Sequence, residues 1–186
     1  MLVSFPSLVL AARAGHVVSF PTDTVPALAV LPEYGAKIYQ CKRRPPDKPL
    51  ILMAPTIEMF SPWIAPTPDI PWIELAHRYW PGALTIVLPA SDRVTTAINP
   101  QQTGTIGLRI PDHPLALSIL QQTGVLATTS ANLSGESPLI AAQDIHAQFP
   151  EVYVLNTDNG GSGQPSTVIA WQDGQWRVLR QGAVHL

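Results

Sequence analysis

The chain has 186 residues, of which 46% are hydrophobic and 13% charged, and this composition excludes an intrinsically disordered protein. The formal net charge of -2 excludes a global basic field that would attract nucleic acid or an anionic membrane. The single cysteine, Cys41, excludes an intrachain disulfide and a multi-cysteine zinc site. Because neither a signal peptide nor a membrane-spanning run is visible, we expect residues 1–186 to form one cytoplasmic domain.

Helices and strands are predicted to alternate along the chain. The first half reads as a helix at 8–14 stopped by Gly15, strands at 16–20 and 27–31, a helix at 33–41, a strand at 50–54 and a helix at 72–79. The second half reads as strands at 84–88 and 105–110, a helix at 114–122, a strand entering the loop at Ser130, a helix at 140–148, a strand at 152–155 and a hairpin of strands at 166–171 and 175–179. Mixed crossover and hairpin connections predict an α/β (α+β mixed) fold with a mixed sheet.

Small polar side chains follow the apolar run at 125–127. Residues 128–135, which include Thr128, Ser130 and Asn132, offer short donors and free backbone N–H groups that suit a phosphate or a carboxylate. Clusters of this kind are also ordinary turn chemistry. A second segment at 42–50 has the complementary charge, with Lys42, Arg44 and Lys48. Cations together with hydroxyls favour a site that handles phosphate.

Further polar candidates stand at the ends of predicted strands, namely Thr22, Thr24, Thr105, Arg109, Ser166 and Arg180. Arg109 lies inside an apolar strand, so it needs either a buried partner or an anionic ligand. A Walker loop and a G-x-G-x-x-G motif are absent, and Ser130 lacks the G-x-S-x-G elbow of a Ser-His-Asp hydrolase. Residues 160–163 read as a flexible glycine-rich loop or lid. The histidines lack metal-ligand spacing, so no protein-held metal is expected.

Seven motifs in order make the chain resemble the YrdC-like threonylcarbamoyl-AMP synthases, in their short, single-domain form. The resemblance runs from about Phe5 to Val184. The motifs are FPTDTV at 20–25, KRRPPDKPLI at 42–51, WPGALT at 80–85, GLRIPDHP at 107–114, SANLSG at 130–135, PSTV at 165–168 and LRQGA at 179–183. The resemblance implies a twisted mixed sheet with flanking helices around a large, positively lined cavity. It also implies an enzyme that condenses L-threonine, bicarbonate and ATP to threonylcarbamoyl-AMP and pyrophosphate.

The resemblance assigns roles residue by residue. It implies that Lys42 and Arg44 are catalytic and, with Lys48, hold the triphosphate. It implies that the nucleotide also contacts Thr105, Ser130, Asn132 and Arg180. For the amino acid it implies that Arg109 clamps the threonine carboxylate, with Thr22, Thr24, Thr128 and Ser166 nearby. ATP is then a substrate, and a magnesium ion is expected on its phosphates.

The product is expected to serve N6-threonylcarbamoylation of adenosine 37 in tRNA, with downstream transfer proteins as partners and a weak contact to tRNA or double-stranded RNA. Two positions depart from the family. Pro26-Ala27-Leu28 replaces the usual Tyr-Gly-Leu, and Met53 stands where many longer members have a histidine. The alternative function is a non-catalytic nucleotide- or RNA-binding paralogue of the same fold.

Overall fold

The computed structural model describes residues 1–157 and 161–186. Its strands are β1 (Leu2–Val3), β2 (Val18–Phe20), β3 (Ala27–Val30), β4 (Ile51–Met53), β5 (Leu84–Pro89), β6 (Thr105–Arg109), β7 (Leu126–Ser130), β8 (Tyr153–Leu155), β9 (Thr167–Gln172) and β10 (Gln175–Arg180). Its helices are α1 (Phe5–Arg13), α2 (Ala36–Lys42), α3 (Trp72–Tyr79), α4 (Pro114–Thr123) and α5 (Ala142–Gln148), with 3-10 turns at Pro32–Tyr34 and Glu58–Trp63.

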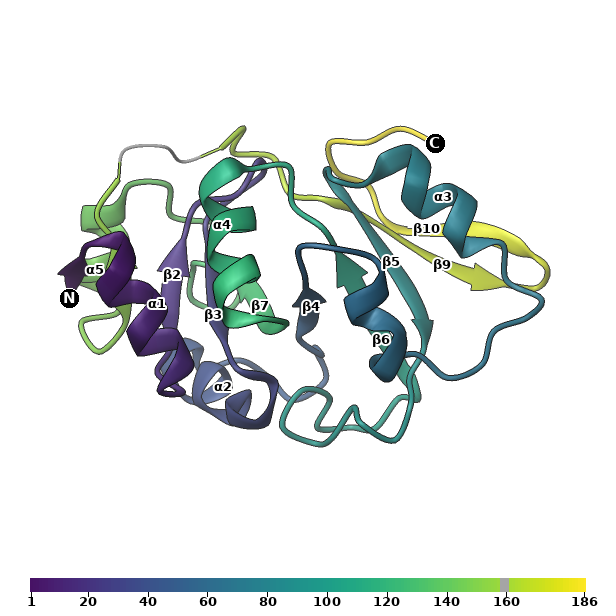
Figure 1. Cartoon of the computed structure of the whole chain (residues 1–186), viewed down its shortest axis with the longest axis horizontal. Coiled ribbons are helices and arrows are strands. Elements are labelled where there is room, and N and C mark those ends of the chain that lie inside the picture. The colour runs from purple at the N-terminus through teal and green to yellow at the C-terminus, as the bar shows by residue number, and fades with distance from the viewer. Residues whose placement is uncertain (158–160) are drawn as a thin grey trace.

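The strands form one ten-stranded sheet in the order β1-β8-β2-β3-β7-β4-β6-β5-β9-β10 (Figure 1). Four of the neighbouring pairs are parallel, namely β1/β8, β2/β8, β4/β6 and β5/β9. The other pairs are antiparallel, so the sheet is mixed. This confirms the predicted fold class.

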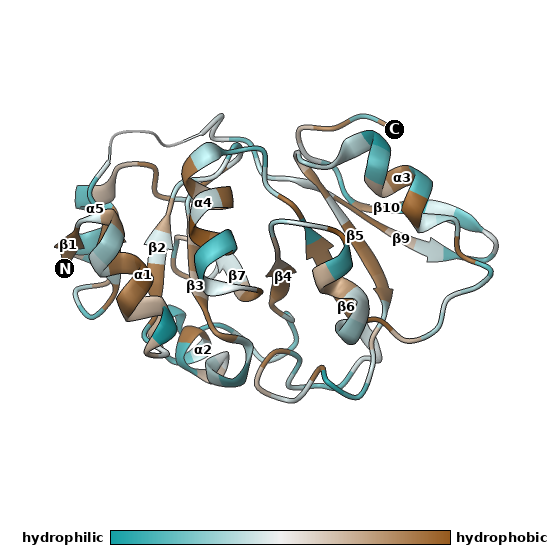
Figure 2. Ribbon diagram, in the orientation of Figure 1, coloured by the Kyte–Doolittle hydropathy of each residue, from teal (hydrophilic) through white to brown (hydrophobic). Residues whose placement is uncertain are grey.

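The two faces of the sheet carry different helices. On one face, Leu28, Leu52 and Ile86 pack in a core with residues of α2, α3 and α5. On the other face, Ala27, Ala29 and Met53 pack with α1 and α4. Successive strand residues point to opposite faces, and this alternation divides the two cores. Figure 2 shows β3, β4 and β5 as largely brown, hydrophobic ribbon, whereas β10 is largely pale or teal.

Helices α1 and α4 pack against the part of their face that is formed by β2, β3, β7 and β8. Further along the sheet, residues of β5, β6 and β9 on that same face line a cavity, and Met53 of β4 borders both the helices and the cavity. Figure 1 shows α4 over β3 and β7, with β5 and β9 beyond it. The cavity therefore lies where this face of the sheet lacks a covering helix in the described part of the chain.

The predicted elements are confirmed in type, with small differences at their ends. The helix expected at 33–41 forms in two pieces, a 3-10 turn at Pro32–Tyr34 and then α2, on either side of Gly35. The strand β1 and the 3-10 turn at Glu58–Trp63 were not predicted, because two residues or a proline-containing turn leave no periodic pattern. Among the residues that the structure describes, no helix is long and apolar enough to cross a membrane.

Candidate active site

The cavity on the open face of the sheet has a volume of about 860 Å³. This size is within the range of pockets that hold small ligands and cofactors. Five cationic side chains line it, Lys42, Arg44, Lys48, Arg109 and Arg180, against two carboxylates, Asp47 and Glu136. The cavity is thus a local concentration of positive charge in a chain whose formal net charge is -2.

One row of side chains crosses four strands at the floor of the cavity. Val168 of β9 pairs with Thr85 of β5, and Met53 of β4 pairs with Arg109 of β6. The antiparallel pairing of Ile86 with Leu108 places Thr85 opposite Arg109. Residues opposite each other in a sheet share a face. The row therefore brings a hydroxyl and a guanidinium side by side between two apolar side chains.

Lys42, the last residue of α2, is almost completely buried at the wall of the cavity. Its Nζ donates to the carbonyl oxygen of Ser130 at 2.5 Å and to Oδ1 of Asn132 at 3.3 Å. Burial lowers the pKa of the Lys42 ammonium, the nearby charge of Arg44 also lowers it, and the resulting pKa is about 7. A cation that is desolvated in this way gains most from an anionic ligand.

Arg44 and Lys48 belong to the loop that joins α2 to β4. Arg44 donates from Nε to the carbonyl oxygen of Lys48 at 2.8 Å and from Nη2 to that of Pro49 at 3.0 Å. Tyr39 Oη also donates to the Lys48 carbonyl, at 3.1 Å. These bonds fold the loop back on itself, so that Arg44 and the exposed Lys48 both line the cavity.

The loop after β7 is held together by Asn132. Its Nδ2 donates to the carbonyl oxygens of Leu133 and Glu136, at 2.7 and 2.8 Å. Its Oδ1 accepts from Ser130 Oγ at 2.5 Å and from Lys42. The amide of Asn132 is thus used within the protein, and we infer that it shapes the loop around a ligand.

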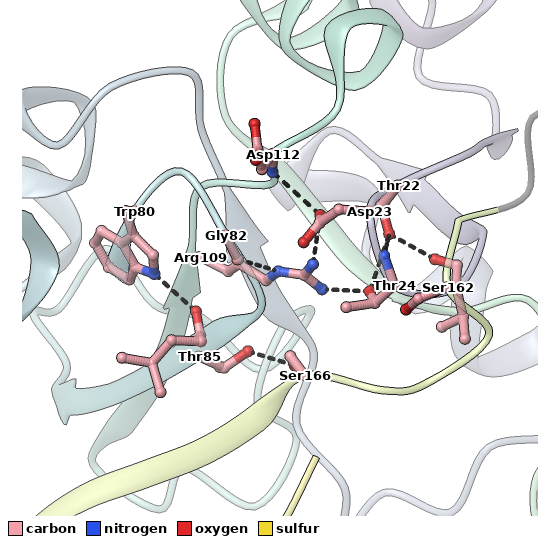
Figure 3. A network of polar contacts seen from close by, with 12 residues as sticks. Thr22, Asp23, Thr24, Trp80, Gly82, Thr85, Arg109, Asp112, Ser162 and Ser166 are labelled. Carbon is pink, nitrogen blue, oxygen red and sulfur yellow. Dashed lines mark hydrogen bonds and ion pairs between the residues drawn. The ribbon is translucent and has the colours of Figure 1, made fainter. Parts of the chain in front are cut away.

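Arg109 has an internal counter-ion, as Figure 3 shows. Its Nη2 lies 2.6 Å from Oδ1 of Asp23, its Nη1 donates to Thr24 Oγ1 at 2.7 Å, and its Nε donates to the carbonyl oxygen of Gly82 at 3.0 Å. The Arg109 side chain is only 3% exposed. The sequence left open whether Arg109 has a buried partner or an anionic ligand. The buried partner is present, and Arg109 also lines the cavity.

Arg180 and Ser166 close the cavity at the C-terminal strands. Arg180 donates to the carbonyl oxygen of Ser166 from Nε and Nη2, at 3.3 and 2.9 Å, and from Nη2 to Ser166 Oγ at 3.2 Å. Ser166 Oγ in turn lies 2.9 Å from Thr85 Oγ1. Between Val178 and Arg180 the pairing of β10 with β9 shifts register. A bulge of this kind re-aims side chains next to a site.

The structure brings together most of the residues selected from the sequence. Those that line the cavity are Lys42, Arg44, Lys48, Ser130, Asn132, Arg180, Thr24, Arg109, Thr128 and Ser166. Thr22 stands behind this surface, where its hydroxyl donates to the Val25 carbonyl at 2.8 Å and contacts Thr24 Oγ1 at 3.0 Å.

Thr105 does not line the cavity. It begins β6, Arg109 ends the same strand, and Thr105 Oγ1 contacts Thr103 at 3.1 Å. Four strand steps of about 3.3 Å each separate the two residues, so Thr105 lies too far from the floor row to meet the same part of a ligand. We therefore leave Thr105 out of the proposed site.

Two residues of this site were not selected from the sequence, Asp23 and Thr85. A signal for Asp23 was present, since a buried Arg109 requires an opposite charge. A signal for Thr85 was weaker, because a threonine between Leu84 and Ile86 is also a common strand residue. Within the described residues, no three His, Cys, Asp or Glu side chains gather in a group that could hold a metal ion.

Comparison with known proteins identifies the family. Residues 11–182 match the family model Sua5/YciO/YrdC, whose description reads "telomere recombination". The chain belongs to this family. It is 36% identical over 183 residues to the threonylcarbamoyl-AMP synthase of Bacillus subtilis (strain 168), a match that covers 92% of this chain and 51% of that protein. It is 31% identical over 186 residues to the synthase of Vibrio campbellii, covering 96% of this chain and 99% of that protein.

Solved structures of Sua5/YciO/YrdC proteins share the fold. Sua5 of P. abyssi in complex with L-threonine matches with a TM-score of 0.87 at 29% identity, covering 98% of this chain and 56% of that one. YciO of E. coli matches with a TM-score of 0.82 at 23% identity, covering 96% of this chain and 88% of that one. The chain thus spans about half the length of the Bacillus and Pyrococcus relatives and nearly all of the Vibrio relative.

Both departures from the family motifs lie at the cavity. Pro26 and Ala27 line it beside Thr24, and Met53 belongs to its floor row. Pro26 has no N–H to donate, and its carbonyl oxygen accepts from the Ala131 N–H at 2.9 Å. The substitutions therefore change the cavity wall itself.

Proposed function

We propose that this protein is an L-threonylcarbamoyladenylate synthase, which condenses L-threonine, bicarbonate and ATP to threonylcarbamoyl-AMP and pyrophosphate. The observation that carries the proposal is one cavity with two chemically different ends. One end has the buried Lys42 with Arg44 and the Ser130 loop, and the other has the Thr85–Arg109 row with Ser166. The first end suits phosphates, and the second suits a small zwitterion that carries a hydroxyl.

The nucleotide binds at the cationic end. Lys42 and Arg44 pair with the triphosphate, and Lys48 of the same loop and Arg180, which also contacts Ser166, add positive charge to the cavity. The Asn132-shaped loop offers Ser130 and small side chains to the nucleotide. Since most of these donors are already held in place by protein carbonyls, little reorganisation is needed when the ligand arrives.

The amino acid binds over the floor row. Arg109 and the hydroxyls of Thr24, Thr128 and Ser166 surround this end, and Met53 and Val168 supply apolar contact. A hydroxyl-lined pocket disfavours an isostere without a hydroxyl, because its polar groups then stay unsatisfied. This supports threonine over valine as the substrate.

The chemistry needs positioning and charge stabilisation. The amine of threonine joins the carbon of bicarbonate with loss of water, and an oxygen of the resulting carbamate attacks the α-phosphorus of ATP. The bond from that phosphorus to the bridging oxygen breaks, and pyrophosphate leaves with the electron pair. Lys42 and Arg44 stabilise the charge that develops on the leaving pyrophosphate.

A magnesium ion on the triphosphate fits the residues present. Such ions bind through one or two carboxylates and phosphate oxygens, and Asp47 and Glu136 both line the cationic end. When bound, magnesium neutralises part of the phosphate charge. The protein would then hold the ion mainly through its nucleotide ligand.

Product formation tests the proposal directly. The protein is incubated with ATP, L-threonine and bicarbonate, and mass spectrometry follows the adenylate and pyrophosphate. Lys42→Ala should lower kcat/KM by about tenfold or more, because charged hydrogen bonds in a sheltered site contribute about 1.5 kcal/mol or more. Lys37→Ala is the matched control, since Lys37 is on the same helix and donates to the Gly15 carbonyl outside the cavity.

Adenylate formation that is lost with Lys42→Ala and kept with Lys37→Ala supports the proposal. ATP binding without any adenylate, under conditions in which a relative's synthase is active, contradicts it. That result would favour the alternative of a nucleotide- or RNA-binding paralogue, with Pro26 and Ala27 as the changes in the cavity wall. In the proposed role the adenylate passes to a separate enzyme that modifies tRNA.

A further inference from the structure

Thr85 is a fully buried hydroxyl on the floor of the cavity. Its neighbours on β5, Leu84 and Ile86, point into the opposite core, so its side chain faces the cavity side of the sheet. It stands opposite Arg109 in the antiparallel pair β5/β6. The hydroxyl therefore lies in the cavity floor beside Arg109, where a ligand of Arg109 would pack against it.

The hydroxyls of Thr85 and Ser166 share one hydrogen bond, and either of them can be its donor. Arg180 can only donate, so its Nη2 makes Ser166 Oγ an acceptor at 3.2 Å. Ser166 can then donate its own hydrogen to Thr85 Oγ1, which lies 2.9 Å away, as Figure 3 shows. In the described part of the chain Thr85 Oγ1 has no other hydrogen-bond partner. When Ser166 is the donor of this bond, the hydrogen of Thr85 is free to donate into the cavity, and an acceptor beside Arg109 selects this arrangement.

An anion is the acceptor that this chain of bonds favours. With Ser166 as the donor to Thr85, the hydrogen bonds run from the cation Arg180 through Ser166 to Thr85, and each donor in such a series strengthens the next. Hydrogen bonds to an ionised acceptor are about twice as strong as neutral ones. Arg109 stands beside Thr85 and favours the same sign of charge.

We propose that Thr85 Oγ1 donates a hydrogen bond to a carboxylate oxygen of the bound amino acid, next to Arg109. Thr85 is then a specificity-determining residue that recognises the α-carboxylate of the substrate. Other residues of the cavity contact the side chain of the substrate. This assignment rests on the proposed function, because it requires an amino acid in the cavity.

Calorimetric titration tests the assignment with L-threonine, L-serine and L-2-aminobutyrate. Thr85→Val keeps the shape and removes the hydroxyl, so it should raise the Kd of all three amino acids by a similar factor of about ten. Thr85→Ser keeps the hydroxyl and should stay within about threefold of wild type. Ser19→Ala is the control, since Ser19 is a buried hydroxyl that does not line this cavity.

The Kd for ATP is measured in every variant and should not change, which separates a lost contact from a damaged fold. Thr85→Ala provides a second deletion of the hydroxyl if the valine variant loses ATP binding. An unchanged Kd for the amino acids overturns the assignment. So does a loss for threonine and serine that spares 2-aminobutyrate, because Thr85 would then meet the substrate hydroxyl. If wild type binds ATP and none of the amino acids, the proposed function itself fails.

Discussion

Lys42 is the residue whose environment differs most from that of a surface lysine. Its side chain is buried, and the two acceptors that it reaches belong to the last residue of β7 and to the loop after it. A charged lysine in this setting is desolvated, which is why its pKa falls to about 7. In the free protein the pKa of Lys42 is thus close to neutral pH, whereas a bound phosphate would favour the charged form of Lys42.

Nucleotide binding should therefore take up a proton at about pH 8, where the unliganded Lys42 is mostly neutral and the phosphate-bound form is charged. The proton is taken up and not released, because the bound phosphate raises the lowered pKa of Lys42 back towards its usual value. The affinity for ATP should fall as the pH rises above about 7. Calorimetry in two buffers with different ionisation enthalpies measures the uptake.

Lys42→Met is the control for proton uptake, because methionine has a similar length and cannot ionise. The variant should bind ATP more weakly and show less proton uptake at the same pH. Equal uptake by the variant and wild type would show that another group takes the proton.

At the residue level, the sequence predicted the ionic half of the site better than the hydroxyl half. Lys42, Arg44 and Arg109 stood out because charge is rare in this chain and Arg109 interrupts an apolar strand. Thr85 did not stand out, since threonine is common in strands and only register shows which face it occupies. Thr105 was selected from its place at a predicted strand end, but it lies away from the cavity. Its distance from the cavity depends on tertiary structure, which the sequence pattern does not report.

Among the elements, the segment 161–166 acts as a strap over the loop at 22–24. The N–H groups of Ser162 and Gly163 donate to the carbonyl oxygens of Asp23 and Thr24, at 3.1 and 2.8 Å. A Cβ on Gly161 would overlap the Thr22 carbonyl oxygen and lie 2.7 Å from that of Thr24. The glycine-rich loop is therefore hydrogen-bonded to the 22–24 loop at Ser162 and Gly163, while Gly160 lies outside the described residues.

Gly161→Ala should push the 22–24 loop away and disturb Thr24 and the Asp23–Arg109 pair. We expect the Kd for L-threonine to rise by about tenfold or more, since a buried charge pair that loses its geometry costs several kcal/mol. Gly163→Ala is matched to it, because both glycines have φ of +76° and a Cβ on Gly163 would meet nothing within 4 Å.

The two alanine variants should share a stability loss of about 1–2 kcal/mol from the left-handed backbone. Thermal unfolding of Gly163→Ala measures this common loss, and threonine titration measures the difference between the variants. Equal Kd values for Gly161→Ala and Gly163→Ala would show that the strap does not position the site.

Element types were predictable wherever a segment had a full hydrophobic period, as in α3 and α4. Short pieces such as β1 were not, because two residues become a strand only through pairing with β8. The strap was also missed, since its hydrogen bonds join segments that are far apart in the sequence. Local pattern alone does not report such contacts.

The main feature of the whole molecule is that positive charge is concentrated in the cavity although the net charge of the chain is negative. Five cations line one cavity, while the chain as a whole is mildly acidic. Positive charge that is enclosed in a cavity attracts a small anion and contacts a polyanionic surface poorly. This distribution suits a protein that makes a diffusible adenylate.

Direct tRNA binding should accordingly be weak at physiological salt and should fall steeply as salt rises. A fluorescence titration with labelled tRNA at several salt concentrations measures both quantities. Competition by ATP would show that the RNA uses the cavity cations, of which Lys48 is exposed. Tight binding at physiological salt would contradict this prediction and favour the RNA-binding paralogue.

The order of strands in the sheet also determines how late in translation the site can be completed. β9 lies between β5 and β10 in the sheet, although β6, α4, β7, α5 and β8 all separate β5 from β9 in the chain. A nascent chain that has emerged as far as β8 has β5 as an open edge and lacks Ser166 and Arg180. Its substrates therefore cannot guide early folding on the ribosome, and ligand stabilisation begins only after the last strands have docked.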